Sequence, residues 1–163
     1  MSATDELLAN NATWAAALQR RDLPRSPARK IAVLACMDAR LDVFAALGLK
    51  AGDAHVIRNA GGAATDDAIR SLAISQRLLG TEEIILIHHT DCGMLTFSEE
   101  AFRESLLAET GTEPQWPAEI FTDVQKNVRR SIARIRASPF LLRTDLLRGF
   151  VYEVDSGRLV EVV

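Results

Sequence analysis

The chain has 163 residues, of which 48% are hydrophobic, and its formal net charge at pH 7 is -3. This composition suits one compact domain, expected over residues 1–163, and it excludes a bilayer-spanning segment and a global attraction to nucleic acid. The first residues lack the basic and apolar regions of a secretory signal. We therefore expect a cytoplasmic protein with no membrane and no nucleic-acid partner.

The N-terminal segment is predicted to form a helix from about Thr4 to Arg20, with the apolar Trp14 in its second half. A stretch that contains two prolines, beginning at Pro24, then interrupts the helical pattern. Residues 1–28 are therefore expected to form a helical arm and a linker. Such an arm can pack on its own domain or reach across to a partner subunit.

Strands and helices alternate in the next part of the chain. Apolar runs predict the strands, while capping residues and glycines mark the ends of the helices. The predicted elements are, in order, a strand at 30–36, a helix at 42–47, a strand at 54–58, a helix at 65–79 and a strand at 84–87. A tight turn, which includes Gly61 and Gly62, is expected between the second strand and the second helix.

The remainder is predicted to add two helices and a hairpin. The elements are a helix at 98–108, a surface loop at 109–117, a longer helix through Ile120, Val124, Val128, Ile132 and Ile135, and a hairpin at 149–163. Several arginines between Arg129 and Arg148 are expected to form a solvated face. This order predicts an α/β fold, with a mostly parallel central sheet flanked by helices, an N-terminal helical arm and a C-terminal antiparallel hairpin.

Two groups of chemically reactive side chains follow two of the predicted strands. Cys36 ends the first apolar run, and His89 and Cys92 follow the third strand. Because the carboxyl ends of parallel strands meet at one edge of a sheet, these side chains are expected to lie together. Two thiolates and one imidazole suit zinc, with a fourth position left for water.

Asp38 and Arg40 are the candidate catalytic pair beside this site. Asp38 can accept a hydrogen bond from zinc-bound water if Arg40 holds its carboxylate in a two-point ion pair. The same carboxylate can instead bind zinc and displace the water, so Asp38 is also a candidate fourth ligand. Because hydroxide competes better as pH rises, we expect an enzyme that is inactive at low pH and active at high pH.

The pattern Cys36-x-Asp38-x-Arg40, then Arg58-Asn59-Ala60-Gly61, then His89-x-x-Cys92 resembles the β-class carbonic anhydrases from about Lys30 to Gly93. The resemblance implies one Zn²⁺ per subunit, held by Cys36, His89 and Cys92, and an Asp38–Arg40 dyad. It also implies a homodimer or homotetramer in which the N-terminal helix packs on the neighbouring subunit.

The implied reaction is reversible hydration of carbon dioxide to bicarbonate and a proton, through zinc hydroxide assisted by Asp38 and Arg40. The chain is similar to the compact microbial branch, which also includes hydrolases of carbonyl sulfide and carbon disulfide, so these substrates are the alternative. No residue matches the substrate-binding glutamine of the plant-like branch, and the backbone amides of Gly61 and Gly62 are expected to replace it. A non-catalytic zinc or thiol module is a third interpretation, which requires Asp38 as a permanent ligand.

Three polar residues near these motifs have simpler expected roles. His88 is a possible ligand in place of His89, but only His89 has the family spacing to Cys92, so His88 is expected to pack beside the sheet. His55 is interpreted as a structural histidine with a satisfied hydrogen bond. Asp91 is expected to cap the turn that follows it.

Overall fold

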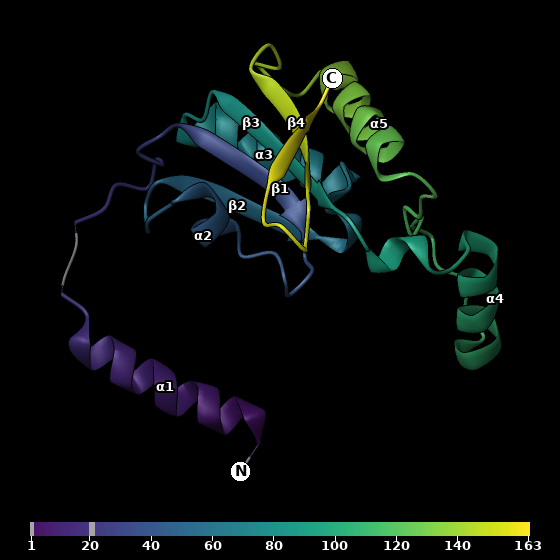
Figure 1. Cartoon of the computed structure of the whole chain (residues 1–163), viewed down its shortest axis with the longest axis horizontal. Coiled ribbons are helices and arrows are strands. Elements are labelled where there is room, and N and C mark those ends of the chain that lie inside the picture. The colour runs from purple at the N-terminus through teal and green to yellow at the C-terminus, as the bar shows by residue number, and fades with distance from the viewer. Residues whose placement is uncertain (1, 20–21) are drawn as a thin grey trace.

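The computed structural model describes residues 2–19 and 22–163. Five strands form one sheet in the order β2-β1-β3-β4-β5, as Figure 1 shows. The strands are β1 (Ile31–Cys36), β2 (Ala54–Asn59), β3 (Glu83–His89), β4 (Leu147–Tyr152) and β5 (Leu159–Val162). The α-helices are α1 (Ala3–Ala17), α2 (Val43–Leu47), α3 (Asp66–Leu79), α4 (Glu99–Thr110) and α5 (Val124–Ala137), and short 3-10 turns lie at Ala60–Gly62 and Gly93–Leu95.

Four of the strands are parallel, which confirms the predicted fold class. β1 pairs in parallel with β2 and β3, and β3 pairs in parallel with β4. Only β5 runs antiparallel, against β4. This pair confirms the predicted C-terminal antiparallel hairpin, although its first strand begins at Leu147 rather than at Gly149. β4 itself pairs in parallel with β3, because α5 carries the chain back across the sheet before β4 starts.

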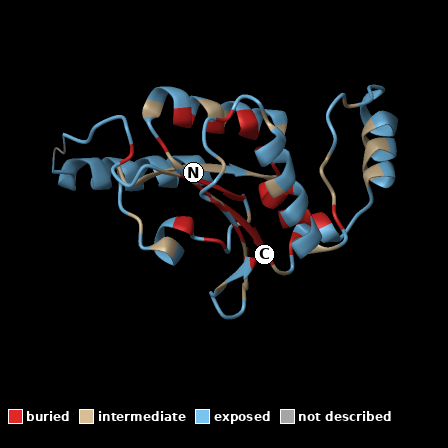
Figure 2. Cartoon of the chain, turned by 90° about the horizontal axis from the view of Figure 1, so that it is seen from above, coloured by how far each residue is buried: buried red, intermediate tan, exposed pale blue. Residues whose placement is uncertain are grey.

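Helices and connecting segments cover both faces of the sheet. Side chains alternate along β1, so that Leu34 packs toward α3 and α5, whereas Val33 packs toward α2 and the segments around Met94 and Phe121. Residues Ala32 to Ala35 are consequently fully buried, and Figure 2 shows this buried centre between the outer layers. A doubly covered sheet brings the ends of β1 and β3 to a protected edge.

The helix starts follow local capping chemistry. The side chains of Thr65 and Ser98 accept hydrogen bonds from the third backbone N–H of α3 and α4, as expected for N-caps. The predicted start of the longer helix at Ile120 was wrong, because Asp123 caps α5 and the helix begins at Val124. Apolar spacing alone included Ile120, although this residue lies in the preceding loop.

The N-terminal arm is present and lies apart from the sheet in Figure 1. α1 ends at Ala17, before the predicted Arg20, which lies outside the described residues. No residue of α1 is buried, and the exposed fractions of Leu7, Leu8 and Trp14 are 66%, 63% and 60%. In the part of the chain that the structure describes, no helix has the length and apolar character of a membrane span.

Candidate metal centre

The carboxyl ends of β1 and β3 bring three candidate ligands together, as the sequence predicts. Cys36 and His89 end these strands, and Cys92 follows within one turn of chain. The ligand atoms of Cys36, His89 and Cys92 all lie within 4.8 Å of one another, and all three residues are buried. The His89 Nε2 atom is 3.1 Å from the Cys36 sulfur, which is 4.0 Å from the Cys92 sulfur.

The protonation chemistry of these side chains fits a soft divalent metal. A hydrogen bond with Cys92 is the main reason that the pKa of Cys36 falls to about 4, and the same contact raises the pKa of Cys92. Two adjacent sulfurs therefore retain one proton unless a cation lets both ionise. The Nδ1 atom of His89 lies 2.8 Å from the Thr90 carbonyl, which fixes the proton on Nδ1 and leaves the Nε2 lone pair facing the sulfurs.

Asp38 and Arg40 form the predicted pair at the rim of this donor set. Arg40 donates from Nε to Asp38 Oδ1 at 3.0 Å and from Nη2 to Oδ2 at 2.8 Å, and its backbone N–H donates to Oδ1 at 2.9 Å. These bonds hold the pKa of Asp38 well below its usual range. Asp38 Oδ2 lies 3.6 Å from His89 Nε2, so an ionised carboxylate oxygen faces the candidate metal position.

Asp91 is not the cap that the sequence suggested. Its Oδ2 atom accepts a hydrogen bond from Arg40 Nη1 at 2.7 Å, and its carbonyl accepts one from Arg40 Nη2 at 2.9 Å. Cys92, not Asp91, is the N-cap of the following 3-10 turn at Gly93–Leu95, and this turn has no side-chain cap hydrogen bond. A φ of 54° at Asp91 turns the carboxylate toward Arg40, which therefore lies between two acidic side chains.

Arg58 supports the backbone of the first motif. Its Nε and Nη2 atoms donate to the Cys36 carbonyl at 2.9 and 2.8 Å, and Nη2 also donates to the Asp38 carbonyl at 2.7 Å. Residue spacing contains no signal for this role, because Arg58 is adjacent to Cys36 only through the parallel pairing of β1 and β2.

The other two histidines lie outside the donor set. His88 faces away from the sulfurs, with Nε2 3.1 Å from the Gly62 carbonyl and Nδ1 3.3 Å from Asn127 Nδ2. Burial lowers the pKa of His88 to about 4, so the ring is neutral. His55 Nδ1 lies 2.8 Å from the Ser75 hydroxyl, which confirms the expected structural hydrogen bond.

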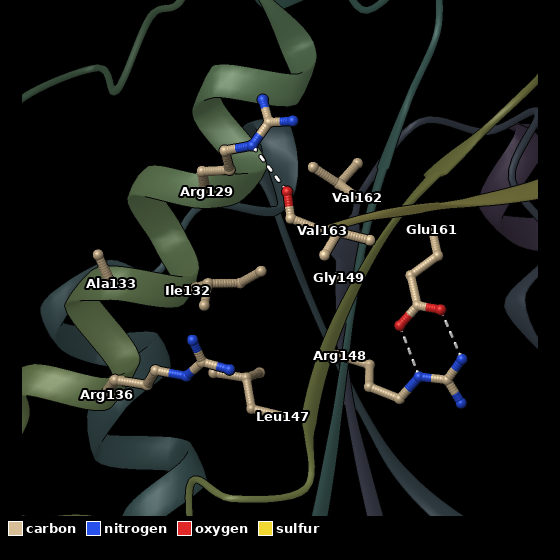
Figure 3. A pocket seen from close by; sticks show the side chains of 10 residues that line it. All are labelled: Arg129, Ile132, Ala133, Arg136, Leu147, Arg148, Gly149, Glu161, Val162 and Val163. Atoms are coloured by element: carbon tan, nitrogen blue, oxygen red, sulfur yellow. Dashed lines mark hydrogen bonds and ion pairs between the residues drawn. The ribbon is translucent and has the colours of Figure 1, made fainter.

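Two cavities differ in their relation to this site. One, of about 640 Å³, lies beside the candidate site and is largely apolar, with Met37, Phe102 and Trp116 among its lining residues. The other, of about 430 Å³, lies between α5 and the β4–β5 pair (Figure 3), where Arg148 is paired with Glu161. The first cavity is lined by Met37 and Gly93, which directly follow the candidate ligands Cys36 and Cys92, whereas no lining residue of the second adjoins a candidate ligand. The first cavity is therefore the one that is relevant to the site.

Comparisons with known proteins agree with this geometry. The sequence profile described as carbonic anhydrase matches residues 31–116. The chain is 55% identical over 162 residues to β-carbonic anhydrase 1 of Mycobacterium tuberculosis, with 99% of each chain covered. It is 35% identical over 160 residues to a carbon disulfide hydrolase of Acidithiobacillus thiooxidans, covering 86% of this chain and 80% of that one. The crystal structure of a carbonic anhydrase from Streptococcus mutans superposes with a TM-score of 0.93 at 42% identity, covering 100% of this chain and 99% of that one.

Proposed function

The chain belongs to the β-class carbonic anhydrase family, whose members are zinc lyases, and on that premise we propose that it catalyses the reversible hydration of carbon dioxide to bicarbonate and a proton. The observation that carries the proposal is the arrangement at the edge of the sheet. Three buried soft donors meet there, beside a carboxylate that an arginine keeps ionised.

We assign the zinc ligands to Cys36, His89 and Cys92, with one ion per chain. The support is the fit of the donor set: the two sulfurs need a cation to ionise together, and the His89 lone pair faces them. Bound there, zinc would supply the Lewis acidity that makes water a nucleophile near neutral pH. Because two thiolates offset the charge of the ion, the site needs additional help from a neighbouring base.

We assign that help to Asp38. Its carboxylate accepts a hydrogen bond from the reacting water and so orients the oxygen toward carbon dioxide. Arg40 keeps this carboxylate ionised, and it occupies both carboxylate oxygens, which opposes their use as a metal ligand. This contact favours catalysis over the interpretation of a non-catalytic zinc or thiol module, in which Asp38 is a permanent fourth ligand.

Hydrolysis of carbon disulfide or carbonyl sulfide is the second candidate function. It is favoured by the 35% identity to a carbon disulfide hydrolase. The same residues can serve it, because the substrate again has an electrophilic carbon between two heavy atoms. The sequence relation to β-carbonic anhydrase 1 is stronger, at 55% identity over almost the whole chain, and we therefore place carbon dioxide first.

The test is a comparison of the three substrates on one zinc-loaded preparation. Stopped-flow hydration of carbon dioxide is followed across pH beside the release of sulfide from carbonyl sulfide and carbon disulfide. We expect fast hydration that rises with pH, since water loses its proton more readily at high pH, and slow sulfide release. Feeble hydration with efficient sulfide release would move the function to the second candidate.

We further propose a homodimer or homotetramer in the cytoplasm. The apolar side chains of α1, including Leu7, Leu8 and Trp14, are left exposed by the residues that the structure describes, which supports packing on a partner subunit. A reducing compartment is supported by Cys36 and Cys92, which must stay as free thiols to bind the metal.

A further inference from the structure

Buried hydrogen bonds through His88 join α5 to the turn behind the candidate metal centre. His88 is 0% exposed, and its Nε2 atom lies 3.1 Å from the Gly62 carbonyl. Since a carbonyl only accepts, Nε2 of the neutral ring carries the proton, and Nδ1 accepts the hydrogen bond from Asn127 Nδ2 at 3.3 Å. Both ring nitrogens of His88 therefore have fixed partners, one on the turn and one on α5.

The turn that His88 holds touches both motifs of the site. A Cβ on Gly62 would lie 2.9 Å from the Cys36 backbone nitrogen and 2.9 Å from the Ile87 carbonyl oxygen. A Cβ on Gly61 would lie 3.3 Å from the side chain of Met94, two residues after Cys92. The turn is thus wedged between the ends of β1 and β3, directly behind Cys36. A displacement of Gly62 must displace the backbone of that ligand.

Burying the polar side chains of His88 and Asn127 costs free energy that is not repaid if their role is only to fill the core. Asn127 is 3% exposed, and its Oδ1 atom has no hydrogen-bond partner among the described residues. Burying such groups costs free energy that apolar side chains of similar volume avoid. Stability therefore does not explain His88 and Asn127, whereas a requirement for a directed hydrogen bond to Gly62 does.

We propose that His88 is a positioning residue for the hydration reaction: it fixes the Gly61–Gly62 turn against Cys36, and Asn127 fixes the orientation of His88. The kinetic part of this inference rests on the proposed function. The structural part does not, since it concerns only the position of the turn.

The test compares His88→Phe with His88→Gln. Phenylalanine fills the space but donates nothing, whereas the amide of glutamine places an N–H near the position of Nε2. We expect His88→Phe to bind zinc normally and to lower kcat about tenfold or more, because small displacements at a reacting centre are costly. His88→Gln should recover most of that loss. His55→Phe is the matched control, since His55 also bonds a neighbouring element, and its kcat should stay within about twofold of wild type because it does not touch the turn.

Hydrogen exchange supplies a readout that is independent of activity. Backbone amides of residues 36–38 and 59–63 should exchange faster in His88→Phe than in wild type, His88→Gln or His55→Phe. If the proposed function is wrong, the exchange result still stands, so the two failures are distinguishable. Should His88→Phe not fold, Asn127→Leu removes the donor to Nδ1 and should produce the same exchange pattern.

Four results would overturn the inference. The first is a folded His88→Phe whose kcat and amide exchange equal those of wild type, and the second is an equal fall of kcat in His55→Phe. The third is a kcat in His88→Gln as low as in His88→Phe. The fourth is loss of zinc from His88→Phe, which would make His88 part of the metal-binding framework instead.

Discussion

Arg40 connects two acidic side chains that come from different parts of the sequence. It binds Asp38 through three hydrogen bonds and Asp91 through two. A guanidinium group that is hydrogen-bonded on both sides has little freedom to release Asp38. The folded chain therefore holds the Asp38 carboxylate in one orientation.

Replacing Asp38 separates a catalytic role from a structural one. We expect Asp38→Ala to retain zinc and to lose turnover by about a hundredfold or more, because the base that orients water is gone. Stopped-flow hydration and the zinc content of the same sample provide the measurement. Substantial loss of zinc would instead identify Asp38 as a structural ligand.

Replacing Arg40 tests the dyad without touching the metal. Arg40→Ala should keep its zinc and lower turnover about tenfold to a hundredfold, since the carboxylate loses its orienting partner. Arg70→Ala is the matched control, because it breaks another arginine–aspartate pair, with Asp67, on the exposed surface of α3. Turnover at the wild-type level in Arg40→Ala would remove the dyad from the mechanism.

The ligand assignment predicts metal loss at three positions. Cys36→Ala, His89→Ala and Cys92→Ala should each release zinc on dialysis, because two remaining ligands hold the ion weakly. His55→Ala should keep it. Metal content is measured by atomic emission, and full retention in any of the three variants would show that its ligand is wrongly assigned.

The sequence was sufficient to predict that Cys36, His89 and Cys92 lie together beside an Asp38–Arg40 pair, but not the other contacts around them. Cys36, His89 and Cys92 could be identified because each follows an apolar run, and strand ends in a parallel sheet converge. The contact between Arg40 and Asp91 could not, since the two residues are 51 positions apart and the contact depends on a left-handed backbone at Asp91. Likewise, the bonds from Arg58 arise from strand register rather than from any local pattern.

At the scale of elements, the turn between β2 and α3 governs how closely the motifs approach. Gly62 has a φ of 67°, and a Cβ there would meet backbone atoms of β1 and β3. This position therefore requires glycine for two reasons, the conformation and the lack of space. Gly80 has a similar φ of 75° but nothing within 4 Å of its ideal Cβ.

These two glycines form a matched pair for a stability test. Both Gly62→Ala and Gly80→Ala place an alanine in the left-handed conformation, which is destabilising. Only Gly62→Ala also pushes the new methyl group against the backbones of β1 and β3. We expect its free energy of unfolding to fall by about 1–3 kcal/mol more than that of Gly80→Ala, as for other overpacked sites. Urea denaturation of both variants at equal concentration checks this, and equal losses would mean that the turn yields without strain.

Element prediction failed where tertiary structure decided the outcome. Ile120 continues the apolar spacing of the helix, yet the Asp123 side chain accepts a hydrogen bond from the Lys126 backbone N–H, and α5 begins at Val124, four residues after Ile120. The direction of β4 depends on the path of α5, which hydrophobic periodicity does not encode. In contrast, Thr65, Ser98 and Gly80 mark helix ends by local chemistry, and there the prediction and the structure agree.

At the scale of the whole molecule, α1 exposes its apolar side chains, and none of its residues is buried by the described part of the chain. Its Ser2 and Asp5 form a capping box, so its start is stabilised locally rather than by packing on the sheet. A helix with no buried face gains little stability from packing on the sheet, which is why we proposed above that a neighbouring subunit provides its covering surface.

This arm predicts how the assembly can be weakened. Leu7→Asp combined with Trp14→Asp should lower the molar mass measured by light scattering, because charged groups cannot be buried at a subunit contact without a partner. Glu6→Ala, on the same helix, should leave the mass unchanged. A wild-type mass in the double variant would place the subunit contact elsewhere.

The most direct test of the whole account is the carbon dioxide hydration rate of the protein with and without zinc. A chelated sample should show no catalysis, and adding zinc up to about one ion per chain should restore it in proportion to the metal bound. Hydration that persists after complete zinc removal, or that stays absent in the fully loaded protein, would contradict the central claim that this site is a zinc centre acting on carbon dioxide.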